Sequence, residues 1–271
     1  MTAKWILLTP LLLVPAQAAT SADCEQILQK ALHDKNPDTR ALAAVALSLA
    51  GSRGPLLPDL VELIHDKDVK VRLAAITSLT EVSNQGASDA LHTALADPVP
   101  EVSFAAAKAL WARKDPAGGD LLRDVLQGES KASSPFITRE KRQAAHMLHT
   151  PRALFLYALF QGAGLAPVPG LGGLASLQAL LLDPHVSGRA TAALLLGNDK
   201  NPATLRALQA ALRDKDWSVR AAAAHSVALR NDPSLMPDLE PLLTDKKEAV
   251  RLRAAAGYLR LSALRSGRTG Q

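Results

Sequence analysis

Two histidines three residues apart, His146 and His149, are the best-spaced candidates in this chain for holding a metal ion, since positions i and i+3 share one face of a helix. A catalytic zinc site needs a third protein ligand, and the acidic Glu140 would lie about 120° away around the helix. The single cysteine, Cys24, stands between two acidic residues, which raise the pKa of a thiol and weaken it as a nucleophile. We therefore expect no catalytic residue, no metal site and no cofactor.

Two further histidines directly precede an aspartate, in His33-Asp34 and His65-Asp66. Both fall where a helix is predicted to end, and the helix dipole would stabilise an imidazolium there, so we interpret them as capping residues. The chain has no Gly-x-Ser-x-Gly elbow for a serine nucleophile and no phosphate-binding Gly-x-x-x-x-Gly-Lys motif. The sequence therefore predicts a protein that is not an enzyme.

The composition favours closely packed helices. Hydrophobic residues occupy 48% of the 271 positions but aromatic residues only 3%, so the apolar content is mostly Ala, Leu and Val. Charged residues make up 21%, with a net charge of +5, and a chain this apolar is not disordered. A single cysteine excludes an internal disulfide framework and a cysteine-based zinc site.

A short segment recurs with a period of about 31 residues. Each copy begins with an aspartate, and in five of the six copies an arginine follows six residues later. The aligned residues are Asp34 and Arg40, Asp66 and Arg72, Asp97 and Ser103, Asp183 and Arg189, Asp214 and Arg220, and Asp245 and Arg251. Neighbouring copies are 31 or 32 residues apart, except that 86 residues separate Asp97 from Asp183.

Both halves of the repeat unit have helical periodicity. Before the turn at Asp66, Leu57, Leu60, Val61 and Ile64 fall on one helix face, and the alanine-rich run after the turn keeps another face apolar. A helix pair of this length cannot bury its own apolar faces and must stack on its neighbours. The sequence thus predicts an all-α fold, an α-solenoid of stacked antiparallel helix pairs in which small Ala side chains let the backbones approach.

This pattern resembles the HEAT-repeat family, specifically its short bacterial variety, the PBS-lyase HEAT-like repeat. The motif Asp-x-x-x-x-Val-Arg-x-Ala-Ala, at 66–75 and 214–223, carries the resemblance, which covers 22–112 and 174–264. It implies that the aligned Asp and Arg residues are structural and form a ladder along the turns, interrupted at Ser103. HEAT-type hydroxylases with a di-iron centre are similar in architecture, but their ligands are His-Glu pairs and this chain has no His-Glu dipeptide. The activity of these hydroxylases is therefore not expected. The name PBS lyase refers to pigment attachment, and nothing in the sequence supports such bilin chemistry.

The centre of the chain departs from the repeat. Residues 153–182 contain no charge, and 162–173 are rich in Gly and Pro. Aromatic residues gather in this part of the chain, at Phe136, Phe155, Tyr157 and Phe160. Two apolar helices joined by such a loop would form a buried plug between the solenoid halves, an exposed knob that contacts a partner, or a hairpin that dips into a membrane surface. These three alternatives stay open, whereas the Gly and Pro residues argue against a membrane-spanning helix.

The first 18 residues have the pattern of an export signal. Lys4 supplies a positive start, an apolar run covers 5–14, and Ala16 and Ala18 are the small residues that precede a cleavage site. An apolar run of about ten residues is too short to cross the ~30 Å hydrocarbon core of a bilayer. We therefore expect cleavage after Ala18 and a periplasmic or secreted protein.

The expected organisation is a signal peptide at 1–18, repeats at 19–115 and 174–265, a modified central repeat with the uncharged insertion at 116–173, and a disordered tail at 266–271. Because a solenoid offers an elongated surface, we expect a non-enzymatic scaffold or adaptor that binds a protein partner outside the cytoplasm. The alternatives are a peripheral membrane protein that attaches through 153–173, and an enzyme or enzyme-associated subunit of the PBS-lyase-like group. Export argues against nucleic acid as a partner.

Overall fold

The computed structural model describes residues 19–51, 56–127 and 187–269, which form α-helices and short 3₁₀ turns without a β-strand. The predicted all-α class is confirmed. The first group of helices is α1 (Ser21–Leu32), α2 (Pro37–Ala50), α3 (Leu57–Glu62) with the 3₁₀ turn η1 (Leu63–His65), α4 (Val69–Thr80), α5 (Gln85–Ala94), α6 (Pro100–Ala112) and α7 (Pro116–Gln127). The second group is α11 (Gly188–Leu195), α12 (Pro202–Ala211), α13 (Trp217–Leu229), η3 (Pro233–Leu235), α14 (Met236–Leu239), η4 (Glu240–Thr244) and α15 (Glu248–Thr269).

In three helix pairs, the turn between the helices starts the second helix with a side-chain cap. Asn36 caps α2, Asp68 caps α4 and Asp216 caps α13. In each case a side-chain oxygen accepts a hydrogen bond from the backbone N–H two residues later, at 3.0, 2.8 and 2.9 Å. Asn and Asp suit this position because they satisfy an N–H group that the first helical turn leaves unpaired. The Asp-Lys-Asx turns of the sequence are therefore helix starts.

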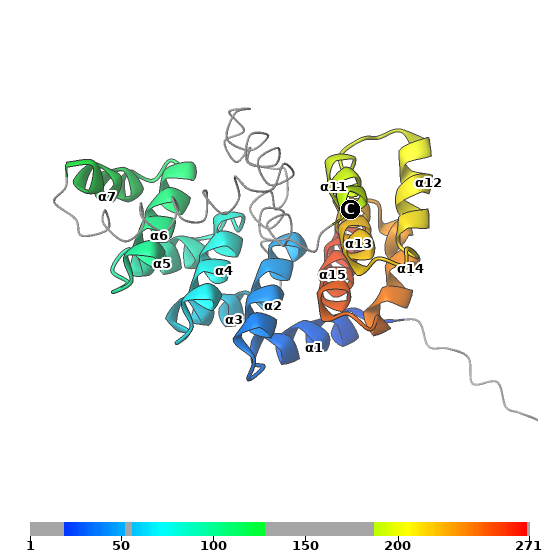
Figure 1. Cartoon of the computed structure of the whole chain (residues 1–271), viewed down its shortest axis with the longest axis horizontal. Helices are drawn as coiled ribbons and strands as arrows, with labels where there is room; N and C mark the ends of the chain where they lie inside the picture. The colour runs from blue at the N-terminus through cyan, green and yellow to red at the C-terminus, as the bar shows by residue number, and fades with distance from the viewer. Residues whose placement is uncertain (1–18, 52–55, 128–186, 270–271) are drawn as a thin grey trace, which may run out of the picture.

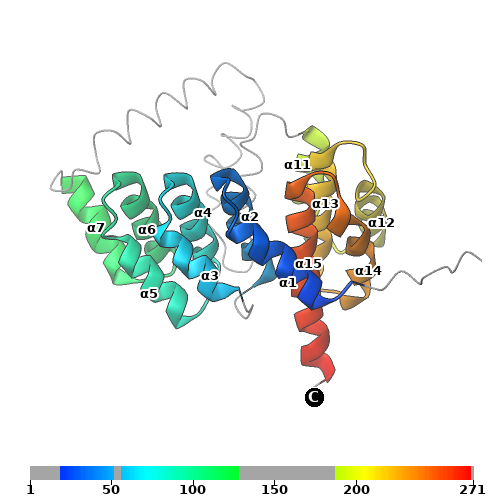
Figure 2. The same ribbon diagram turned by 90° about the horizontal axis from the view of Figure 1, so that it is seen from below.

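The helices form two layers (Figures 1 and 2). The second helices of the pairs, α2, α4, α6, α11, α13 and α15, pack side by side, and α1, α3, α5, α12 and α14 each pack against the second helix of their own pair. The core between them is mostly Ala and Leu. Helix α13 is buried from Ser218 to Ala228 except at Arg220, because it has neighbours on several sides. The low aromatic content of the sequence thus matches a core built from small and aliphatic side chains.

The order of the helices in space differs from their order in the chain. The second helices follow one another as α6, α4, α2, α15, α13 and α11, so the last helix of the chain packs directly on α1 and α2 (Figure 1). We call the contact of α1 and α2 with α15 the seam. Side-chain hydrogen bonds cross it, among them Ser21 Oγ to Ser262 Oγ at 2.7 Å, Thr39 Oγ1 to Glu248 Oε2 at 2.8 Å, and Arg260 Nη1 to the Leu49 carbonyl at 3.2 Å. The two repeat groups therefore form one array whose middle contains both ends of the described chain.

Residues 266–269, which belong to the tail predicted from residue 266, form the last turn of α15. Buried Tyr258 and Leu261 hold α15 against its neighbours, and a helix that is already nucleated extends at little cost through residues such as Ala263 and Leu264. The predicted signal peptide and most of the predicted central repeat lie outside the described residues. Within the described ranges, no helix combines the length and apolar character needed to cross a membrane.

Candidate functional surface

Arg40 and Asp66 form the best-defined ion pair of the repeat turns. The guanidinium donates from Nε and Nη2 to the two carboxylate oxygens at 2.7 and 2.9 Å, and from Nη1 to the Asp34 carbonyl at 2.8 Å. Both side chains are only 9% exposed. Burial opposes ionisation of Asp66, but the hydrogen bonds from Arg40 and from the Asp68 N–H outweigh it, so the pKa of Asp66 lies below its usual range. One arginine thus joins two consecutive turns.

The same contact repeats along the array. Arg72 pairs with Asp97, Arg189 with Asp214 and Arg220 with Asp245, so each arginine reaches the aspartate of the next turn. Hydrogen bonding to Asp245 raises the pKa of Arg220, and the pKa of Asp245 is lowered despite its burial. Arg72, Arg220 and Arg251 also donate to the carbonyl of the aspartate six residues earlier, at 2.8, 2.7 and 2.7 Å. We call this row of pairs the ladder.

The ladder has two breaks within the described residues. Ser103 stands where an arginine would be, and its hydroxyl donates to the Pro100 carbonyl at 3.2 Å. At the seam, Arg251 would face Asp34, but its Nη2 lies 3.7 Å from Glu248 and no ion pair joins it to Asp34. The Arg251 side chain is 33% exposed, against 9% for Arg40. Asp183 lies outside the described residues.

The repeat turns lie along one edge of the array. On this edge, the ladder and the helix caps leave lysines as the main exposed charges. The aspartates of the turns are occupied by arginines or by backbone N–H groups, whereas the lysines between them reach solvent. The exposed lysines are Lys35, Lys67, Lys70, Lys215, Lys246 and Lys247. Asp38 is also exposed and lies 3.2 Å from Lys70. We call this edge, where the second helices present their N-termini, the turn edge, and both its lysines and its helix dipoles favour a negatively charged partner.

Arginines at the opposite end of the second helices were missed by sequence reasoning. Arg113 donates to the carbonyls of Leu79 and Val82 at 3.0 and 2.8 Å, and Arg260 donates to Leu49 across the seam. Both bind carbonyl groups where a neighbouring helix ends, a position at which the helix dipole favours a cation. The signal available in the sequence was the spacing: Arg260 follows the aligned Arg251 by nine residues, and Arg113 follows the aligned Ser103 by ten.

His225 and Arg253 form a buried pair on neighbouring helices α13 and α15. Arg253 Nη1 lies 3.1 Å from His225 Nδ1, and because arginine only donates, Nδ1 is the acceptor and the histidine is neutral. Burial lowers the pKa of Arg253 to about 10. With exposures of 0% for His225 and 5% for Arg253, neither group is accessible to a substrate.

The cysteine and the histidines do not assemble a reactive site in the described ranges. Cys24 is fully buried, and burial together with the nearby carboxylates raises the pKa of its thiol to about 12. His33 lies 3.6 Å from Asp59, and His92 lies 3.0 Å from Asp115. No group of three metal-ligating side chains occurs in the parts of the chain that the structure describes. His146, His149 and the aromatic residues Phe136, Phe155, Tyr157 and Phe160 lie outside those parts.

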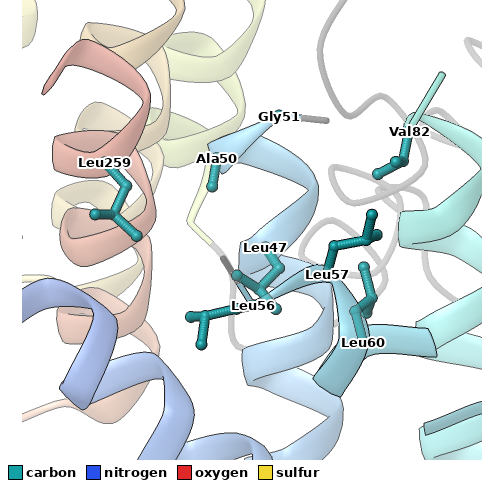
Figure 3. Close-up of a pocket in the computed structure, with 8 residues that line it drawn as sticks. All are labelled: Leu47, Ala50, Gly51, Leu56, Leu57, Leu60, Val82 and Leu259. Atoms are coloured by element: carbon teal, nitrogen blue, oxygen red, sulfur yellow. The ribbon is translucent and has the colours of Figure 1, made fainter. Parts of the chain in front are cut away.

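An apolar pocket lies beside the seam, between α2, α3, α4 and α15 (Figure 3). Leu47 and Ala50 of α2 face Leu259 of α15, and Leu57 and Leu60 of α3 form another wall. All of its lining residues within the described ranges are apolar or glycine.

Comparison with protein families identifies HEAT repeats at residues 57–133 and 174–260, which together make up more than half of the chain. The chain belongs to the HEAT-repeat family. The two matched ranges contain α3 to α7 on one side of the seam and α11 to most of α15 on the other. The short PBS-lyase type of HEAT repeat stays a prediction.

Among solved structures, the chain is similar to human deoxyhypusine hydroxylase in complex with glycerol. The identity is 20% and the TM-score 0.31, over 89% of this chain and 84% of that one. A search of curated proteins found no match.

Proposed function

We propose that this HEAT-repeat protein is a non-enzymatic scaffold or adaptor that acts outside the cytoplasm and binds an acidic segment of a protein partner along the turn edge. The observation that carries the proposal is the placement of charge on that edge. Lys67, Lys35 and Lys246 stand on three consecutive turns in space, on either side of the seam, while Asp66 and Asp245, the aspartates beside Lys67 and Lys246, are held in the ladder.

The burial of the candidate reactive groups in the described part of the chain favours binding over catalysis. An enzyme site needs titratable groups that a substrate can reach. In the described part of the chain, Cys24, His225 and Arg253 are buried, and the apolar pocket beside the seam carries no such group. The predicted export signal at 1–18 supports a location outside the cytoplasm.

The test compares two triple variants with equal changes of charge. Lys35→Glu, Lys67→Glu and Lys246→Glu are combined in one protein, and the exposed Lys108→Glu, Lys200→Glu and Arg206→Glu in the control. Immobilised poly-glutamate is the first probe, and crosslinking in the native envelope fraction identifies the partner. At low salt we expect the turn-edge variant to lose about tenfold or more in affinity and the control to lose little, with the difference shrinking as salt screens the charges.

Equal losses in both variants would mean that net charge, and not the turn edge, governs binding. Turnover of a substrate by the purified protein would contradict the non-enzymatic proposal. Detection of the native protein in the cytoplasmic fraction would contradict its location.

A further inference from the structure

Residue Ala19 lies in a cleft formed where α1 begins beside η3, α14 and α15. Glu240, Tyr258, Met236 and Arg265 contribute to the walls of this cleft, together with Ala19 itself. Tyr258 is 4% exposed, and Glu240 is half-buried. The cleft therefore brings the beginning of the described chain next to a carboxylate of the C-terminal repeat.

The peptide group between Ala19 and Thr20 is held at its carbonyl and at its N–H. The Tyr258 hydroxyl donates to the Ala19 carbonyl at 2.5 Å, from the middle of α15. The next residue, Thr20, caps α1: the Asp23 carboxylate accepts from the Thr20 backbone N–H at 2.8 Å, and the Thr20 hydroxyl accepts from the Asp23 N–H at 3.2 Å. Residue Ala19 is thus anchored at the cleft through its carbonyl.

Glu240 is the carboxylate of this cleft that has no cation partner. It forms no ion pair with any residue that the structure describes, while its charge helps to raise the pKa values of Cys24 and Tyr258. The other charged groups near it are Asp23 of α1, which is used in the cap, and Arg265 of α15, which is exposed. A half-buried carboxylate gains stability when a cation is placed beside it.

We infer that Ala19 is the N-terminal residue of the working protein and that its α-ammonium group pairs with Glu240, so that removal of residues 1–18 strengthens the seam. This rests on the export proposed above. Cleavage adds water across the Ala18–Ala19 amide: Ala18 leaves with a carboxylate, and the released amine of Ala19 takes up a proton. In the precursor the same nitrogen is an uncharged amide, so the ammonium at Ala19 exists only after cleavage.

The test compares two otherwise identical chains, one that starts at Ala19 and one with Gly-Ser added before it. The first is made by expressing Met followed by Ala19, since the initiator Met is removed before Ala. At pH 6.5 we expect the chain that starts at Ala19 to be the more stable one, with an unfolding equilibrium constant about five- to tenfold lower than that of the chain with Gly-Ser added. An amine that gains a partner has a raised pKa, so its stabilisation is complete below the unfolded value of about 8 and is lost as the pH rises through the folded value.

The difference should be absent in Glu240→Gln versions of both chains. Tyr258→Phe, which keeps the charges, should weaken both chains equally. Equal stability of the two parent chains overturns the inference, as does a difference that persists at pH 10.5 or in Glu240→Gln, because the added residues would then act sterically. N-terminal sequencing of the native protein tests the cleavage separately: a start at any residue other than Ala19 overturns the processing step even if the recombinant chains differ.

Discussion

At the residue scale, the ladder depends on the shape of arginine. A guanidinium donates two parallel hydrogen bonds to one carboxylate and a third to a carbonyl, as Arg40 does with Asp66 and Asp34, and a lysine ammonium cannot copy this planar arrangement. The positions of these residues follow from the sequence period. Their partners do not, because spacing alone does not say that each arginine reaches the next turn or that Arg251 leaves Asp34 unpaired.

Removal of one ladder arginine should be far more costly than removal of an exposed cation. In Arg40→Ala, the largely buried Asp66 carboxylate loses its partner, and we expect a loss of about 3–5 kcal/mol in the free energy of unfolding. Lys70→Ala is the control, since Lys70 and Asp38 are 74% and 67% exposed and such pairs contribute about 0–1 kcal/mol. Urea denaturation measures both, and similar losses would contradict the structural role of the ladder.

At the scale of the helices, close approach depends on small residues at one repeated position. Ser78 and Ser226, each six residues after a ladder arginine, donate to the carbonyls of Ala44 and Ala193 on the neighbouring helix at 2.6 and 2.9 Å. Gly257 occupies the same position in α15, where an added Cβ would lie 2.9 Å from the Cβ of Ala228. Periodicity predicted the helix pairs, but the choice of Ser or Gly at this position becomes meaningful only once the neighbouring helix is known.

Two glycines of α15 should respond in opposite directions to the same substitution. Gly257→Ala places a methyl group against Ala228 and Leu239, and overpacking of this kind costs about 1–3 kcal/mol. Gly267→Ala adds a methyl group where no atom lies within 4 Å, and it should raise helix stability by up to about 1 kcal/mol. Thermal unfolding followed by circular dichroism compares the two, and a Gly257→Ala protein as stable as the parent would contradict the close packing of α13 and α15.

At the scale of the whole molecule, the repeats were predictable and their order in space was not. The period of 31 residues indicates how many helix pairs stack, but the pairs present similar apolar faces, so any end could in principle meet any other. The seam is decided by particular contacts, such as Thr39 with Glu248 and Tyr258 with Ala19, which have no counterpart in the repeat pattern. No periodic signal marks them in advance.

A disulfide across the seam should form spontaneously and stabilise the protein. The hydroxyl oxygens of Ser21 and Ser262 are 2.7 Å apart, which places their Cβ atoms within about 5.5 Å of each other, close to the range of a disulfide. In a Cys24→Ala background, Ser21→Cys with Ser262→Cys should crosslink on mild oxidation. Because the two positions are 241 residues apart, the gain in stability should reach up to about 5 kcal/mol.

Non-reducing electrophoresis detects the crosslink, and urea denaturation with and without reductant measures the gain in the free energy of unfolding. The pair Ser48→Cys with Ser262→Cys is the control, since the Ser48 hydroxyl donates to the Val45 carbonyl of its own helix. A crosslink that forms equally in both proteins, or in neither, would contradict direct contact of the chain ends.

The seam also determines when the molecule is completed during synthesis. Its contacts join residues up to 241 positions apart, whereas the ladder pairs join residues only 25 or 26 apart. Contacts between distant residues form slowly because a long loop must close first. On the ribosome α1 and α2 emerge before α15, and the surface that they give to α15 stays uncovered until α15 has been made. A chain truncated before its last helix would therefore expose apolar surface in the middle of the array instead of at its end, and would need protection there from aggregation.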